Sequence, residues 1–102
     1  MAGINTLTNQ ILSWGEDKGI LGNSDPKSQF LKCAEEVGEL ASAISGGDIE
    51  DCMDAIGDVY VTLTMVASLL GVDMESCIDI AYREISGRTG NMVDGVFVRE
   101  AN

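Results

Sequence analysis

The stretch 29-QFLKCAEEVGELASAISGGDIEDCMDAIGDVYVTLTMVASLL-70 decides how this chain folds. It contains eight carboxylates, yet after Lys32 no basic residue follows until Arg83. Apolar residues recur through it at helical spacing, so much of it is patterned for burial. A carboxylate on a covered helix needs a counter-charge or a metal ion. The chain's own bases do not supply that charge here, so the stretch predicts a binding site for a cation.

The overall composition excludes several classes of function. With 102 residues, of which 45% are hydrophobic, the chain suffices for one small domain, which we expect to span residues 1–102. Its net charge of −11 disfavours nucleic acids and anionic membrane surfaces as partners. The absence of histidine removes the Ser-His-Asp triad and most zinc sites. What remains is a protein that binds cations, or a small anion delivered with a cation.

The cysteines and the chain start predict a soluble cytoplasmic protein. Cys33, Cys52 and Cys77 are odd in number and show no CxxC spacing, which is typical of free thiols in a reducing compartment. The start MAGINTLTNQ has neither the basic nor the apolar part of a signal peptide. Asp58 interrupts the longest apolar run, 55–72, and leaves it too short to span a bilayer.

Helical periodicity and turn residues predict an all-α fold. We expect four helices, packed antiparallel, at residues 4–17, 26–45, 49–70 and 73–85. The cluster LGNSDP reads as a turn between the first two. After the fourth helix, Asp94-Gly95 between two apolar runs predicts a short C-terminal hairpin or hooked tail.

The apolar stripes predict an oligomer. On the helix at 26–45 the stripe expected to be buried is Phe30, Cys33, Ala34, Val37, Ala41 and Ile44. On the helix at 49–70 it is Ile49, Met53, Ile56, Tyr60, Leu63 and Ala67. The opposite side of that second helix is also apolar beyond Asp58, and a helix apolar all round is buried all round. We therefore expect a helical-bundle assembly, either a homodimer or a homotetramer.

Four carboxylates should meet across the SGGD turn. Glu36 and Glu39 lie about two turns before it, and Asp54 and Asp58 lie two to three turns after it, at similar heights. Acids in such a pattern are most often a solvated helix face. The missing bases, the apolar surroundings of Asp58 and the matched heights argue against that interpretation here. An oxygen-only cluster favours magnesium, with manganese as the alternative.

At this point the residues resemble a known family. EEVGEL at 35–40 followed by DAIGDVYVTL at 54–63 resembles the MazG-like group of all-α nucleoside triphosphate pyrophosphohydrolases, in which ExxE on one helix precedes ExxD on the next. AYREISGRTGNMVDGVFVRE at 81–100 is similar to the tail of its small phage-type members. The resemblance implies magnesium-dependent hydrolysis of a nucleoside triphosphate, NTP or dNTP, to the monophosphate and pyrophosphate.

The resemblance also implies roles for individual residues. Glu36, Glu39 and Asp58 match the family's metal ligands, whereas Ala55 replaces the Glu of ExxD, and Asp54 is the expected substitute as fourth ligand. Glu35 or Glu39 would orient the attacking water. The expected phosphate contacts are Lys32, Arg83 and Arg88. For Arg83, a surface ion pair with Asp79 or Glu84 is an equal alternative.

A rival hypothesis is a non-catalytic acidic helical module, either a mimic of DNA charge or an oligomerisation adaptor. The two hypotheses differ in one measurable property, because an enzyme of this kind binds nucleotide only with metal and a mimic binds neither. The sequence leaves open the preferred base and sugar, and the choice between ordinary and damaged nucleotides.

Overall fold

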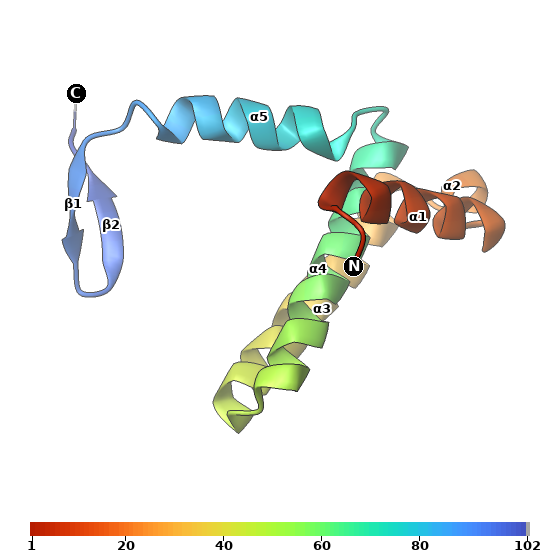
Figure 1. Cartoon of the computed structure of the whole chain (residues 1–102), viewed down its shortest axis with the longest axis horizontal. Helices are drawn as coiled ribbons and strands as arrows, with labels where there is room; N and C mark the ends of the chain where they lie inside the picture. The colour runs from red at the N-terminus through yellow and green to blue at the C-terminus, as the bar shows by residue number, and fades with distance from the viewer. Residues whose placement is uncertain (102) are drawn as a thin grey trace.

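The computed structural model describes residues 1–101, which form helices and one small hairpin (Figure 1). The elements are α1 (Ile4–Asp17), α2 (Ile20–Asn23), α3 (Pro26–Gly46), α4 (Ile49–Leu69), α5 (Met74–Ile85), β1 (Gly90–Val93) and β2 (Val96–Arg99). The four predicted helices and the hairpin are confirmed. The sequence missed the single turn of α2, which overlaps the predicted turn cluster.

Local chemistry fixes where α3 and α4 begin and end. The Asp25 carboxylate accepts a hydrogen bond from the Ser28 backbone N–H at 2.8 Å and so caps α3, with Pro26 in the first helical turn. Gly47 closes α3 in the left-handed conformation, with φ 78°. Asp48 then caps α4 by accepting from the Glu50 N–H at 2.9 Å. The C-cap Gly47 and the N-cap Asp48 are adjacent in the chain, so α3 and α4 return along each other as a tight antiparallel hairpin.

The α3–α4 hairpin is the body of the molecule, and α1 crosses it. Cys33 and Glu36 of α3 are buried, as are Ala55, Thr62 and Met65 of α4. The crossing of α1 is close: a Cβ on Gly15 would lie 2.5 Å from the Met65 sulfur, and only glycine leaves room. A hydrogen bond of 2.7 Å between the hydroxyls of Thr8 and Tyr60 ties α1 to α4 a second time.

The predicted burial of the apolar stripes holds for Cys33 and Ala67 and is wrong for their large members in the single chain. Phe30, Val37 and Ile44 of α3 are 51–64% exposed, and Ile49, Met53 and Ile56 of α4 are 57–71% exposed. Two paired helices bury only a narrow seam, and small or flexible side chains such as Ala55 and Met65 form it here. Buried residues of α4 come from both of its apolar sides, since Ala67 belongs to the predicted stripe and Met65 to the opposite side. The wider apolar side of the α3–α4 hairpin is exposed in the single chain and is available for another contact.

The C-terminal part of the chain extends away from the body (Figure 1). No residue of α5 is buried. Beyond it, β1 and β2 pair antiparallel, with Val93 opposite Val96. Asp94 (φ 49°) and Gly95 (φ 82°) form the turn between the strands. Positive φ at both residues is what a tight two-residue hairpin turn needs. The radius of gyration is 16.0 Å, whereas a compact domain of this length has about 13 Å.

The central helix α4 is long and apolar enough to cross a bilayer by length and composition alone. Core helices of soluble proteins meet the same criterion. Here α4 packs along α3 and carries Asp54 and Asp58 in its interior. Carboxylates at such depth are costly in lipid.

Candidate functional site

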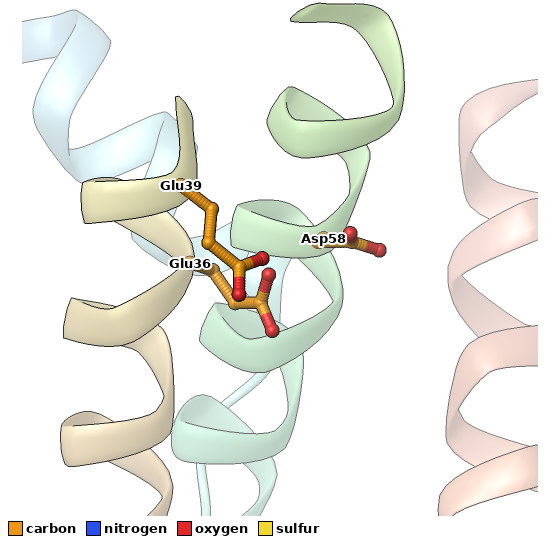
Figure 2. A group of neighbouring side chains, drawn as sticks. All are labelled: Glu36, Glu39 and Asp58. Atoms are coloured by element: carbon orange, nitrogen blue, oxygen red, sulfur yellow. The ribbon is translucent and has the colours of Figure 1, made fainter. Parts of the chain in front are cut away.

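Three of the predicted carboxylates come together at the seam between α3 and α4. Glu36 and Glu39 are three residues apart on α3 and share one side of that helix. Asp58 faces them from α4. One oxygen of each lies within 4.8 Å of the others. Figure 2 shows Glu36 and Glu39 reaching from α3 toward α4, and Asp58 on α4 with its carboxylate directed to the right of the view. We call these three residues the carboxylate cluster.

Glu36 is the most constrained member of the cluster. It is 8% exposed, and its Oε2 atom is buried without a hydrogen-bond partner among residues 1–101. Its Oε1 atom lies 3.6 Å from Lys32 Nζ. Burial, followed by the adjacent Glu39 carboxylate, raises the pKa of Glu36 above its ordinary value. A buried carboxylate oxygen without a partner is costly, so this atom indicates a missing positive ligand.

Asp58 has a similar environment on the other helix. It is half-buried, and burial raises its pKa; the negative charges of Asp54 and Glu36 raise it further, while Lys32 opposes them. The pKa values of two acids on separate helices are therefore both raised above their ordinary values. The oxygen-only donor set, with an orphaned oxygen at its centre, fits a hard divalent metal ion.

The predicted fourth ligand is not part of this cluster. Asp54 lies one turn before Asp58 on α4 and is exposed, and its carboxylate does not join the three gathered oxygens within residues 1–101. It is near enough for its charge to raise the pKa of Asp58. Ala55, which stands where the family has Glu, is buried against α3. A role for Asp54 as a ligand stays a prediction.

Lys32 and Glu35 stand at the rim of the cluster. Lys32 Nζ donates a hydrogen bond to Glu35 Oε2 at 3.3 Å, and this bond, with the charges of Glu35 and Glu36, raises the pKa of the lysine. Both side chains are largely exposed. Lys32 is therefore an exposed cation at the rim of the cluster, shared between Glu35 and Glu36.

Arg83 and Arg88 do not lie where they could contact a phosphate at the carboxylate cluster of their own chain. Arg83 pairs with Asp79 at 2.9 Å and Arg88 with Glu84 at 2.7 Å, both one turn away along the chain. The surface ion pair predicted as the alternative for Arg83 is confirmed. Figure 1 shows α5 running away from the α3–α4 hairpin, so one chain does not bring these arginines to its own carboxylates.

Sequence reasoning missed a second concave feature. A notch of about 1020 Å³ opens between the first half of α1, the last half of α4 and the first half of α5. Tyr60, assigned to packing from the sequence, lines it and bonds to Thr8 there. No sequence signal could have located this notch, because it depends on the angle at which α1 and α5 leave α4.

Comparison with known protein families identifies a match that includes the whole cluster. A profile of the MazG nucleotide pyrophosphohydrolase domain matches residues 24–93, which contain α3, α4, α5 and β1. A protein of 18.2 kDa from the rep-hol intergenic region of Haemophilus phage HP1 (strain HP1c1), described as uncharacterised, is 34% identical over 73 residues. The aligned region is 72% of this chain but 45% of that protein, so the chain spans less than half the length of this relative.

A solved structure has the same arrangement of elements. It is a MazG-like pyrophosphohydrolase of cyanophage S-2L, bound to dGDP and three catalytic Mn²⁺ ions per active site. The two chains superpose with a TM-score of 0.71 over 99% of this chain and 100% of the other, at 24% identity. The predicted all-α fold is thereby confirmed, including the extended C-terminal part.

Proposed function

Because the chain belongs to the MazG nucleotide pyrophosphohydrolase domain family, we propose that it hydrolyses nucleoside triphosphates, NTPs or dNTPs, to the monophosphate and pyrophosphate. The observation that carries this proposal is the buried, unpartnered Oε2 atom of Glu36 beside the carboxylates of Glu39 and Asp58. A solvated acidic face would leave no such atom. A divalent metal ion bound between these carboxylates would supply the partner that this atom lacks.

The cluster residues would hold the metal in this reaction. Glu36 and Glu39 supply oxygens from α3 and Asp58 supplies one from α4, with Asp54 as the proposed fourth ligand. A divalent metal bound there neutralises polyphosphate charge and lowers the pKa of a coordinated water. Glu35 or Glu39 orients the attacking water, and Lys32 leaves its carboxylate to contact a phosphate oxygen. Magnesium is the proposed ion, and manganese the alternative.

The nature of the nucleotide and of the assembly is also part of the proposal. The cyanophage relative binds dGDP and Mn²⁺, which makes dGTP with manganese the first combination to test. We propose a homodimer or homotetramer, since the wide apolar side of the α3–α4 hairpin is exposed in one chain. Free cysteines at 33, 52 and 77 agree with a reducing, cytoplasmic setting.

A pyrophosphate-release assay tests the function directly. Each of the ribo- and deoxyribonucleoside triphosphates is incubated with the full chain and either Mg²⁺ or Mn²⁺, and the nucleotide product is identified by chromatography. We expect equal amounts of monophosphate and pyrophosphate, and none of either with a chelator present. Release of orthophosphate and diphosphate instead, or no turnover of any nucleotide with either metal, contradicts the proposal.

Calorimetry separates the enzyme from the acidic module. A non-hydrolysable dNTP analogue is titrated into the chain with and without Mn²⁺, and Mn²⁺ is titrated alone. The enzyme hypothesis predicts that nucleotide binds only with metal. If neither metal nor nucleotide gives heat, the charge-mimic hypothesis is favoured, because the acids at the seam would then be a solvated surface.

A further inference from the structure

Lys32 is the basic residue that pairs with the carboxylate cluster, and it belongs to the helix that supplies two of the three acids. Its Nζ atom lies 3.6 Å from Glu36 Oε1, and no other ion pair among residues 1–101 involves a member of the cluster. Lys32 precedes Glu36 by one helical turn and Glu39 by two, so the three side chains leave α3 on one side. The lysine therefore lies in line with the carboxylates.

The charge of Lys32 compensates the cluster only in part. One ammonium faces three carboxylates and approaches a single oxygen of Glu36, while Oε2 of the same side chain is buried without a hydrogen-bond partner among residues 1–101. The lysine also acts across the seam: burial is the main cause that raises the pKa of Asp58, and the Lys32 charge opposes it. A divalent ion at the cluster would meet this charge, because both cations are attracted to the oxygens of Glu36.

The two positive charges would be close enough to repel each other strongly. A small divalent ion binds a carboxylate oxygen at about 2.1 Å, so an ion on Glu36 Oε1 would lie at most about 6 Å from the ammonium in its present position. Even at the dielectric constant of water, a unit charge and a divalent charge about 6 Å apart repel enough to lower affinity about tenfold. Lys32 therefore works against metal binding as long as it stays beside Glu36.

The lysine side chain is able to leave the cluster, because it stands on the solvent side of it. The side chain of Lys32 is 54% exposed, whereas that of Glu36 is 11% exposed. Its second partner, Glu35, lies 3.3 Å from the ammonium and is more exposed still. Exposed ion pairs of lysine contribute little free energy and break readily. A polyphosphate carries several negative charges, so it attracts the ammonium more strongly than one carboxylate does.

We propose that Lys32 is a provisional counter-ion of the carboxylate cluster, which weakens the binding of a divalent metal ion until a nucleotide polyphosphate draws the ammonium away. The inference rests on the proposed function, since it requires the metal site and the triphosphate. It makes metal and nucleotide each improve the binding of the other, and such coupling is reciprocal by linkage. Without nucleotide, the chain holds metal weakly because its own lysine competes for Glu36.

Calorimetric titration of Mn²⁺ into full-length proteins at physiological salt tests the competition. Lys32→Met removes the charge and keeps an unbranched side chain that favours helix, whereas Lys32→Arg keeps the charge. Lys27→Met is the matched control: Lys27 is exposed on the same helix, nine residues before Glu36. That separation is roughly 13 Å along the helix, beyond the Debye length of about 8 Å.

The expected results follow from the position of the charge. Lys32→Met should bind Mn²⁺ about tenfold more tightly than the wild type, and Lys32→Arg and Lys27→Met should bind it as the wild type does. A non-hydrolysable dNTP analogue should raise the Mn²⁺ affinity of the wild type, and in Lys32→Met this increase should be about tenfold smaller. At one fixed Mn²⁺ concentration, the metal should raise the melting temperature of Lys32→Met more than that of the wild type.

Several outcomes overturn the proposal. Equal or weaker Mn²⁺ binding by Lys32→Met shows that the lysine does not compete with the metal. A gain in Lys27→Met or in Lys32→Arg as large as that in Lys32→Met shows that the charge at this position is not the cause. Pyrophosphate release by the wild type is measured in parallel. If it is normal while Lys32→Met binds Mn²⁺ unchanged, the counter-ion role fails and the function stands; a wild type that neither binds Mn²⁺ nor turns over nucleotide refutes both.

Discussion

Glu36 stands on α3 at a position where an aliphatic side chain would otherwise pack against α4. Its backbone position is set by the helix, and its carboxylate points into the seam beside Glu39 and Asp58. Burial raises the pKa of Glu36, and also that of Asp58. The arrangement is unfavourable without a cation and becomes favourable with one, so metal binding and stability should be linked at these residues.

The first prediction concerns the cluster. Glu36→Gln and Asp58→Asn should each lower turnover by roughly 100-fold or more, because each removes an anionic metal ligand. Mn²⁺ should raise the melting temperature of the wild type and leave that of both variants almost unchanged. The matched control is Glu50→Gln, an exposed acid in the first turn of α4 outside the cluster. Near-wild-type activity and metal stabilisation in both cluster variants would refute the site.

The second prediction concerns the crossing of α1 over α4. Gly15→Ala should lower the free energy of unfolding by about 1 kcal/mol, since overpacking exceeds the gain in helix propensity. The Cβ would meet the sulfur and methyl of Met65, a side chain only 1% exposed. Chemical denaturation measures the change. Gly38→Ala, which meets nothing within 4 Å, should instead stabilise α3. If both changes stabilise equally, the crossing is looser than the structure indicates.

The sequence predicted correctly that Glu36, Glu39 and Asp58 lie close together, and there is a physical reason why it could not separate Asp54 from them. Spacing on α3 and the short SGGD turn set the height and side of Glu36, Glu39 and Asp58. Spacing does not set rotamers, so it could not show that Asp54 remains outside while Asp58 turns in. Nor could it show that Glu36 would be the buried member.

At the scale of elements, the helix boundaries were predictable because capping residues define them. Asp25, Asp48 and Asp73 each accept a backbone N–H at a helix start. The faces of the helices were less predictable. On α4 both sides are apolar, and periodicity alone cannot tell which of two apolar sides meets α3. The single turn of α2 was missed because a turn that short has no periodicity.

The third prediction uses the cap of α3. The hydrogen bond from the Ser28 N–H lowers the pKa of Asp25 from its ordinary 3.8. A carboxylate with a lowered folded-state pKa stabilises the fold above its unfolded pKa, and this contribution is lost as pH falls through the folded-state value. Asp25→Ala should therefore lower the melting temperature by about 5 °C near neutral pH. Below the ordinary pKa of 3.8 the difference from wild type should progressively disappear.

Thermal melts of both proteins between neutral pH and about pH 2.5 measure this difference. Asp17→Ala, at the C-terminal end of α1, is a suitable control because its carboxylate caps no helix start. A gap between Asp25→Ala and wild type that stays constant down to the lowest pH would mean that the carboxylate charge is not what caps α3.

At the scale of the whole molecule, one chain leaves two things incomplete. The segment 74–99, which contains α5, β1 and β2, has no core of its own, and the carboxylate cluster has Lys32 as the base beside it within residues 1–101. Arg83 and Arg88 are on the segment 74–99, away from the cluster of their own chain. If they contact the phosphates of a nucleotide, they do so from another copy. The sequence predicted an oligomer from its excess of apolar surface, and this stays a prediction.

The fourth prediction follows from that division. Glu36→Gln and the double variant Arg83→Ala/Arg88→Ala should each be inactive alone. Refolded together in equal amounts, they should recover about a quarter of wild-type pyrophosphate release, because half of the dimers are mixed and each mixed dimer has one intact site. A mixture of Glu36→Gln with Asp58→Asn, both altered in the cluster, should recover nothing. If the first mixture recovers no pyrophosphate release, the two arginines either act within their own chain or do not contact the nucleotide.

The order of the elements along the chain has a consequence for how the protein folds as it is made. Synthesis runs from the N-terminal side, and segments that are complete can fold before later ones leave the ribosome. Glu36, Glu39 and Asp58 are all present by residue 58, whereas α5 begins at residue 74. A nascent chain can therefore bring these three carboxylates together before α5 has emerged.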